Sequence, residues 1–404
     1  MKVFSHSRWL LIFMTVVLAF ALPMPSTATA AAALPMTVTN KSGSASPVHL
    51  YVVGVQLSTG RLGYADSSGR FHPWKLPRAG GPVAAPDVSI AGPRNGAKKR
   101  VALPRGMSGR IYFSFAKRLS FRLVPGGLVQ PAPWNPSDPS HQIRFDWSEF
   151  TLDGGGLWLN SSQVDQFAAP HTVSVTSTAA KTTSAGAVKP GGFAAVVRAI
   201  KADKAFARTV VTGADGQVLR VLAPGKAVAA GLFQADYLKP AIDNAWSTYR
   251  GRALTVVPAA NGPRFHGRTQ GNQLVFRNAA GRVVASFAKP SSTDVWNCDG
   301  ALFAPNDRVR GPIARTLCAA LHRGTLATMH TQPSSAKGFY QTSPANLYSR
   351  AIHAQMRDGK AYGFAFDDNV ADGDKLFERN GAKVVVDETS LELLGGAEID
   401  YVED

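Results

Sequence analysis

Two carboxylates that could form a catalytic pair, Glu149 and Asp165, flank a segment that also contains Trp158 and Asn160. Hydrolysis of a glycosidic bond needs one carboxylic acid to protonate the leaving oxygen and a second carboxylate to activate water or attack carbon. A flat aromatic ring and an amide are suited to bind sugar rings and hydroxyls. The residue types therefore fit polysaccharide hydrolysis. They also fit a simpler interpretation, because an acidic residue on an exposed strand usually serves solubility.

A β-hairpin is predicted to carry this segment. Residues 144–152 and 157–160 have the composition of strands, and Asp153-Gly154-Gly155-Gly156 between them is a turn sequence whose glycines accept positive φ. Since side chains of a strand alternate between its two faces, Phe150 and Leu152 should point inward to a core. The opposite face of the same strand then carries the polar side chains.

The two carboxylates are not brought together by the hairpin alone. Strand alternation places Glu149 and Thr151 on one face, and a turn centred on the glycines places Asn160 opposite Glu149. Asp165 follows five residues later, which corresponds to roughly 16 Å along a straight strand. The pair can therefore meet only if the chain bends back after Ser162.

The first part of the chain is predicted to be mainly β. From residue 36 to about 175, short runs of β-branched and aromatic residues alternate with Gly, Pro, Ser and Asn, as in a β-sandwich or barrel. Prolines crowd residues 73–104 and 125–139, which we expect to form long surface loops. The further expected strands are Val48–Val55, Arg110–Phe115 and Phe121–Val124.

The middle of the chain has a different pattern. After a Ser/Thr/Ala/Gly stretch at 174–192, apolar residues recur at helical spacing, and strand-like runs interrupt them. The expected helices cover Ala194–Phe206, Tyr237–Tyr249 and Ile313–His322. We predict a mixed α/β domain at 186–340, inserted into a β domain made of 31–185 and 341–404.

Residues 1–30 are predicted to be an export signal. A positively charged start precedes the apolar run Leu10–Leu22 and the small-residue sequence Ala28-Thr29-Ala30. No later segment offers about 20 uninterrupted apolar residues, so we expect a secreted, extracellular protein without a membrane span.

The net charge of +17 is scattered, with Lys98-Lys99-Arg100 as its one three-residue basic run. Because no nucleic-acid-binding motif accompanies it, we predict no nucleic-acid partner.

The chain has two cysteines, Cys298 and Cys318. In an exported protein, an even pair favours one disulfide, here closing a loop of about 20 residues. Two buried free thiols are the alternative. Neither cysteine has further ligands at metal spacing nearby, so we predict no metal site and no cofactor.

Several segments resemble the signatures of thaumatin-like proteins. Glu149-Phe150-Thr151-Leu152, then Asn160–Phe167 and Pro170, are similar to the core signature of that superfamily. Tyr348–His353 and Tyr362–Asp368 are similar to its closing signature.

Two features resemble a narrower group. The chain lacks the dense disulfide framework of plant thaumatin-like proteins, and it contains an α/β region with the segments Asn297–Asn306 and His322–Leu326. In both respects it is similar to glycoside hydrolase family 64, the bacterial laminaripentaose-producing β-1,3-glucanases. The resemblance spans nearly the whole chain after residue 30, and the signatures keep their order.

This resemblance implies a fold and an activity. The fold is a crescent of a thaumatin-like β domain and an α/β domain, with a wide groove between them. The activity is endo-acting, inverting hydrolysis of β-1,3-glucan, such as laminarin, curdlan or fungal wall glucan, mainly to pentasaccharide. The family's catalytic Glu and Asp are sixteen residues apart, as are Glu149 and Asp165. By this correspondence Glu149 is the general acid and Asp165 the general base.

The candidate glucan-binding residues are Thr151, Trp158, Asn160, Asp367 and Asp368. Packing is the alternative for Trp158, and capping of a turn is the alternative for the Asp367–Asp368 pair. Two other function classes stay open. A non-catalytic β-1,3-glucan-binding module would need no carboxylate pair, and a polyanion-binding structural protein rests only on the positive charge. We expect a monomer.

Overall fold

The structure is a computed structural model. It describes residues 33–176, 182–259, 262–305 and 307–357, together with the backbone of strands β23 (Lys375–Arg379) and β24 (Ala382–Val386). The predicted export signal and the Asp367–Asp368 pair lie outside the described residues. The described part is mainly β with some helices, as predicted. Within it, no helix has both the length and the apolar character needed to cross a membrane.

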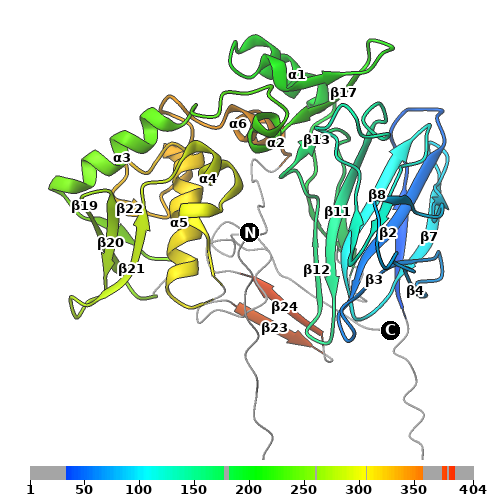
Figure 1. Cartoon of the computed structure of the whole chain (residues 1–404), viewed down its shortest axis with the longest axis horizontal. Coiled ribbons are helices and arrows are strands. Elements are labelled where there is room, and N and C mark those ends of the chain that lie inside the picture. The colour runs from blue at the N-terminus through cyan, green and yellow to red at the C-terminus, as the bar shows by residue number, and fades with distance from the viewer. Residues whose placement is uncertain are drawn as a thin grey trace, which may run out of the picture. The chain divides into compact units, whose positions relative to one another are not determined.

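An antiparallel seven-stranded sheet dominates the first part of the chain (Figure 1). Its strands follow the order β12-β11-β8-β2-β3-β4, and β6 pairs with β2. Their bounds are β2 Val48–Gln56, β3 Arg61–Ala65, β4 Phe71–Pro73, β6 Ile90–Ala91, β8 Met107–Phe115, β11 Phe145–Leu152 and β12 Leu157–Asn160. The predicted hairpin is the β11–β12 pair, in which Glu149 lies opposite Asn160 and Leu152 opposite Leu157.

Both faces of this sheet are packed. Phe150 and Leu152 are buried on one face, as predicted, in a cluster with Val52 and Ile111. Partly buried Met36 packs against the same cluster, so this face is covered by the short sheet of β1 (Leu34–Thr39) and β7 (Lys98–Leu103). The first part of the chain is therefore a β-sandwich on this side.

The opposite face of the sheet carries aromatic residues. Tyr51, Tyr112 and Trp147 form a buried cluster there with Leu119 and Phe121. The last two residues precede β9 (Arg122–Val124) in the chain. Strand β9 is the middle strand of a small sheet, between β10 (Gly127–Val129) and β5 (Val83–Ala84). The chain between 119 and 129 thus covers part of the face that also carries Glu149.

One expected loop is partly a strand. Residues 73–104 were predicted to be a long loop, but β7 lies within them and pairs along its whole length with β1, from Leu34–Leu103 to Thr39–Lys98. Val101 and Leu103 are buried while Lys98 and Arg100 are exposed. This alternation of apolar and polar residues with a period of two is typical of a strand, but the nearby prolines favoured a loop. Lys98 and Arg100 of the basic run therefore lie on the exposed face of β7, while Lys99 lies on the other face.

The middle region surrounds the largest core cluster of the described residues. It contains the sheet β21-β20-β19-β18-β22 and the three-stranded sheet β13-β17-β16. The strands are β13 Gln166–Phe167, β16 Val210–Thr212, β17 Val218–Leu222, β18 Leu254–Val256, β19 Phe265–Gln270, β20 Gln273–Arg277, β21 Val283–Ala288 and β22 Thr331–Gln332, besides the separate hairpin of β14 Val173–Thr176 and β15 Thr182–Ala185. The helices are α1 Gly192–Ala202, α2 Pro224–Ala229, α3 Lys239–Gly251, α4 Ser292–Asn297, α5 Arg310–His322 and α6 Leu347–His353, with short 3-10 turns at Ala207–Thr209, Gly300–Leu302 and Ala336–Gly338.

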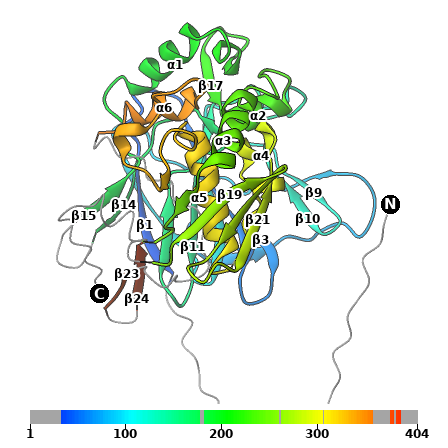
Figure 2. The same cartoon turned by 90° about the vertical axis from the view of Figure 1, so that its left-hand side faces the viewer.

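A local sequence signal explains where helix α4 begins. Ser291 caps α4 by accepting from Asp294 N while the Asp294 side chain accepts from Ser291 N, which is a capping box. Helix α3 lies beside β19 (Figure 2). The helix predicted to reach Phe206 is wrong at its end: α1 stops at Ala202, and Phe206 is buried after a separate turn.

The β-rich and helical regions are joined closely. Strand β13 pairs with β17, and helix α6 packs on α1, with Tyr348 and Ile352 in the large core of the middle region. The helical start of the predicted 341–404 return segment therefore belongs to that core. The backbone of β24, by contrast, lies beside β12. The domain boundaries as a whole stay a prediction.

Candidate active site

Glu149 forms an ion pair with Arg110 on the neighbouring strand. The two residues are cross-strand partners on β11 and β8. Arg110 Nε donates to Glu149 Oε1 at 3.1 Å, and Arg110 Nη2 lies 3.0 Å from the same oxygen. Only 13% of the Glu149 side chain is exposed. Because both contacts go to Oε1, Oε2 is the oxygen without a partner among the described residues.

Arg110 is itself held in place. Its guanidinium lies 4.8 Å from the centre of the Trp147 ring, and Nη1 donates to the Tyr112 hydroxyl at 3.2 Å. The same hydroxyl donates to Gln130 Oε1. Burial raises the pKa of Tyr112 to about 12, so the hydroxyl keeps its proton near neutral pH. Gln130, Tyr112 and Arg110 thus form a chain of contacts that ends at Glu149.

Asp165 is ion-paired with a lysine from the helical region. Lys226 Nζ on α2 lies 3.3 Å from Asp165 Oδ1, and 12% of the Asp165 side chain is exposed. The Asp165 carbonyl oxygen accepts from Ala223 N at 3.0 Å. The Tyr348 hydroxyl on α6 donates to Gln163 O at 2.7 Å. The segment that carries Asp165 is therefore fixed by α2 and α6.

The chain after β12 does not continue as a regular strand. Gln166 Nε2 donates to Phe145 O at 2.7 Å, and the amides of Ala168 and Ala169 donate to Asp146 Oδ2 at 2.9 and 3.0 Å. In the hairpin register, Asn160 pairs with Glu149, so position 164 would face Phe145 and position 163 would face Asp146. Gln166, Ala168 and Ala169 contact Phe145 and Asp146 instead, so the hairpin register does not continue beyond Asn160.

Both carboxylates act electrostatically on the same two side chains, Arg110 and Tyr112. Burial by itself would lower the pKa of Arg110, but Tyr112 and the carboxylates of Glu149 and Asp165 raise it overall. The same two carboxylates also raise the pKa of Tyr112, after the larger effect of burial. Glu149 and Asp165 thus both act electrostatically on the Arg110–Tyr112 pair, and Glu149 alone of the two is in ion-pair contact with it.

Three of the five candidate binding residues share the Glu149 face. Thr151 lies opposite Trp158, and its Oγ1 is 2.7 Å from Ser108 Oγ. Asn160, opposite Glu149, is buried, and Trp158 is half-buried against the glycine turn, where a Cβ on Gly155 would lie 3.0 Å from its ring. The structure brings Thr151, Trp158 and Asn160 together around the hairpin. The other two candidates are outside the described residues.

A pocket of about 230 Å³ opens beside Glu149. Gly54 on β2 and Gly109 on β8 lie opposite each other at this place. A Cβ on Gly54 would lie 2.1 Å from Ser108 O, and a Cβ on Gly109 would lie 2.2 Å from Val53 O. Only glycine fits such a close approach of two backbones. The pocket is lined by Val53, Gly54, Leu62, Ser108, Gly109, Arg110, Leu128, Gln130 and Glu149. Its wall thus combines apolar groups with the Arg110–Glu149 pair.

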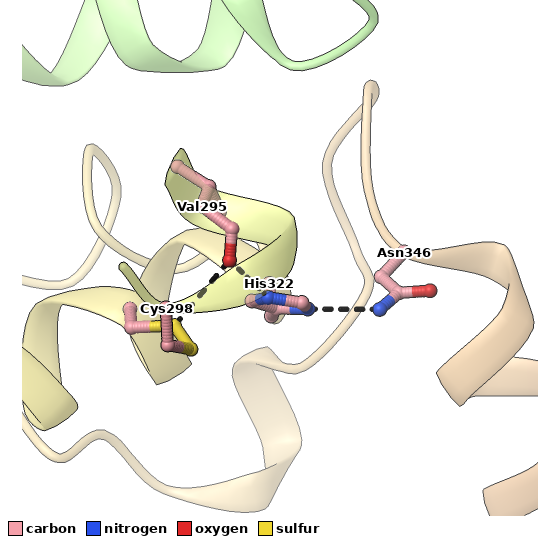
Figure 3. Close-up of a disulfide and its surroundings, with 5 residues drawn as sticks. Val295, Cys298, His322 and Asn346 are labelled. Carbon is pink, nitrogen blue, oxygen red and sulfur yellow. Dashed lines mark hydrogen bonds between the residues drawn. A yellow bond between two sulfur atoms is a disulfide. The ribbon is translucent and has the colours of Figure 1, made fainter. Parts of the chain in front are cut away.

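Cys298 and Cys318 form a disulfide between α4 and α5, as predicted (Figure 3). Together with His322 they place three metal-ligand atoms within 4.8 Å of one another. Zinc is bound by cysteine thiolates, and sulfurs bonded to each other are not thiolates. The ring of His322 also has partners on both sides, Val295 O at 2.7 Å and Asn346 Nδ2 at 2.9 Å. This cluster is structural.

Comparison with known proteins identifies the family. The profile of the β-1,3-glucanase family, glycoside hydrolase family 64, matches residues 32–389. The chain belongs to this family. The prediction made from the Glu149 and tail signatures is thereby confirmed at the level of the family.

Relatives within glycoside hydrolase family 64 are similar over most of the chain. It is 43% identical over 335 residues to a glucan endo-1,3-beta-glucosidase of Arthrobacter sp. (strain YCWD3), and 42% identical to that of Cellulosimicrobium cellulans. Each alignment covers 81% of this chain and 60% of the relative, so the chain spans about 60% of their length. A crystal structure of a laminaripentaose-producing β-1,3-glucanase in complex with laminaritetraose matches with a TM-score of 0.78 and 47% identity, covering 83% of this chain and 93% of that one.

A second, short similarity involves another protein class. Over 45 residues, 11% of the chain, it is 53% identical to the iron–sulfur cluster insertion protein ErpA of Pseudomonas savastanoi pv. phaseolicola, of which 39% is covered. Iron–sulfur clusters are held mainly by cysteine thiolates. Both cysteines of this chain are engaged in the disulfide, so the similarity supports no cluster chemistry here.

Sequence reasoning missed the cations that pair with Glu149 and Asp165 in this family 64 chain. Arg110 lies on a predicted strand, two residues before Tyr112. Its position opposite Glu149 follows only from the register between β8 and β11, which the sequence does not provide. Lys226 is 61 positions after Asp165 in the sequence, and no local pattern connects them. Trp134 and Gln130 lie in a segment predicted only as a surface loop, although each contacts a residue of the site.

Proposed function

We propose that this chain is a secreted, extracellular endo-β-1,3-glucanase that acts as a monomer on β-1,3-glucan. The observation that carries the proposal is a pair of nearly buried carboxylates, each with one oxygen held by a cation. Both carboxylates also act electrostatically on the Arg110–Tyr112 pair. Two carboxylates flanking a bond are what glycoside hydrolysis needs. Membership in family 64, and the glucanase names of the similar proteins, support the substrate.

In this proposal Glu149 is the general acid and Asp165 the general base of an inverting reaction. Arg110 occupies Glu149 Oε1, so Oε2 is the oxygen that would carry the proton to the leaving group. Lys226 occupies Asp165 Oδ1, so Oδ2 would accept a proton from the attacking water. An inverting enzyme leaves room for that water, and its carboxyl groups are about 6.5–9.5 Å apart.

Glucan is proposed to lie along the Glu149 face. Thr151, Trp158 and Asn160 would contact sugar there, and the pocket beside Glu149 has a mixed apolar and polar wall suited to one sugar ring. Asp367 and Asp368 are proposed to bind sugar hydroxyls as the family resemblance implies. The same resemblance implies the thaumatin-like β domain, the crescent with a wide groove and the pentasaccharide product. We propose no nucleic-acid, membrane, metal or cofactor partner.

The alternative is a non-catalytic β-1,3-glucan-binding module. It is less well supported because binding alone gives no reason to hold two nearly buried carboxylates in ion pairs. The polyanion-binding class has less support still, because the basic run belongs to a strand that pairs with β1 along its whole length and does not line the pocket beside Glu149.

Purified protein is expected to release reducing ends from linear β-1,3-glucan and to leave cellulose and chitin intact. Internal cleavage should produce a rapid fall in polymer length before short oligosaccharides accumulate, with pentasaccharide as the main product. Reducing-end assays and chromatography of the products check this. Protein that sediments with insoluble glucan but releases no sugar after long incubation would be a binding module. Binding to teichoic acid or nucleic acid that weakens with salt, with no response to glucan, would favour the polyanion class.

A further inference from the structure

The Lys226 ammonium is held between two side chains of the β-rich region. Its Nζ lies 3.3 Å from Asp165 Oδ1 and 4.3 Å from the centre of the Trp134 ring. A lysine is usually a flexible, hydrated point charge, and 32% of this side chain is exposed. An aromatic face attracts a cation, so Trp134 and Asp165 together restrict the position of the ammonium.

The backbone below Lys226 is also fixed relative to Asp165. Helix α2 starts with Pro224, whose ring presets the helical φ. Ala227, the residue after Lys226, is fully buried. Gly225 approaches α4 so closely that a Cβ there would lie 2.6 Å from Asn297 Oδ1. Ala223 N, just before the helix, donates to Asp165 O. Lys226 and Asp165 are therefore joined both through the backbone and through their side chains.

Asp165 itself lies outside any regular strand. Residues 161–165 are assigned to no strand, and β13 begins only at Gln166. Its carboxylate acts electrostatically on groups of two neighbouring elements, raising the pKa of Arg110 and Tyr112 on β8 and of Tyr348 on α6. Within the described part of the chain, Lys226 is the cation in ion-pair contact with it. Among the described residues, the ammonium is therefore the contact that fixes which oxygen of Asp165 is paired.

We infer that Lys226 is a positioning residue for the reaction: it holds Asp165 Oδ1 so that Oδ2 faces the attacking water, and Trp134 in turn holds Lys226. The inference rests on the proposed function, because it assumes that Asp165 is the base. It assigns the helical region a role in orienting a carboxylate that the β-rich region carries. It also predicts which kinetic constant changes when the contact is lost.

Replacing Lys226 with methionine removes the charge and keeps an apolar chain against Trp134. We expect kcat on β-1,3-glucan to fall about 10- to 100-fold, since small displacements of a reacting group have effects of this size. KM should stay within about twofold, because the base acts on water and does not bind sugar. Lys226→Arg should restore most of kcat, since arginine keeps the charge and also stacks on aromatic rings.

The matched control is Lys239→Met. Lys239 forms an exposed ion pair with Asp243 on α3, away from both carboxylates, so kcat and KM should not change. Thermal unfolding is measured for every variant. The inference is overturned if Lys226→Met leaves kcat unchanged or raises only KM. It is also overturned if Lys226→Met lowers kcat together with thermal stability and Lys226→Arg does not restore kcat. Wild-type activity is measured first: its absence refutes the proposed function, whereas an active wild type with an unaffected Lys226→Met variant refutes only the role of Lys226.

Discussion

Asp165→Asn is expected to lower kcat on β-1,3-glucan by about 10²- to 10⁴-fold, the range found for loss of a general acid or base. Asparagine has nearly the size of aspartate, and its amide oxygen can still accept from the Lys226 ammonium. It cannot accept a proton from water at neutral pH, so activation of the nucleophile is lost. Steady-state kinetics with linear glucan, together with sedimentation of the protein with insoluble glucan, check this: binding should be nearly unchanged.

The control for this substitution is Asp243→Asn. Asp243 is also an aspartate in ion pairs with lysines, Lys239 and Lys289, but it lies on α3 and has no contact with the site. Its replacement should leave kcat within about twofold of wild type, in line with the small worth of exposed ion pairs. Asp165→Asn with near-normal turnover would show that another group activates the water.

Glu149→Gln is expected to cause a loss of similar size on glucan, about 10²- to 10⁴-fold. The glutamine carbonyl oxygen can still accept from Arg110, so the neighbouring contacts to Trp147 and Tyr112 should persist. The amide has no acidic proton to give to the leaving oxygen. Turnover of a β-1,3-glucoside with a dinitrophenyl leaving group, which needs no proton, should be spared in part.

The ratio of the two substrates is the test of the acid role. Wild type and Glu149→Gln are compared on glucan and on the activated glucoside, and the loss should be clearly smaller on the latter. An equal loss on both substrates, or a thermal unfolding temperature well below that of wild type, would mean that Glu149 acts through the fold. If Asp165→Asn, and not Glu149→Gln, keeps turnover of the activated glucoside, then Asp165 is the acid and Glu149 the base.

Local pattern was sufficient to predict the strand that carries Glu149. Alternation of apolar and polar residues gave the inward direction of Phe150 and Leu152, and the glycine turn gave the register that places Asn160 opposite Glu149. These features depend on neighbours within a dozen residues. The strand β7 was missed for a local reason too: the prolines around it favoured a loop, although Val101 and Leu103 alternate as a buried strand requires.

The position of Asp165 could not be predicted in the same way. It depends on Ala223 and Lys226 from α2 and on Tyr348 from α6, which lies 183 positions further along the chain. No periodicity records such contacts, because they arise only when the helical core packs against the strand. The sequence could state the condition that the chain must leave the regular strand after Ser162, and the structure meets it through the contacts of residues 166–169 with Phe145 and Asp146.

The stereochemistry of the first product tests the proposed pair most directly. Wild-type protein is mixed with a β-1,3-linked oligosaccharide, and proton NMR follows the anomeric signals of the new reducing end before mutarotation equilibrates them. If Asp165 activates a water while Glu149 protonates the leaving oxygen, the α-anomer must appear first. If the β-anomer appears first, the reaction retains configuration, and Asp165 is not the base that this account makes it.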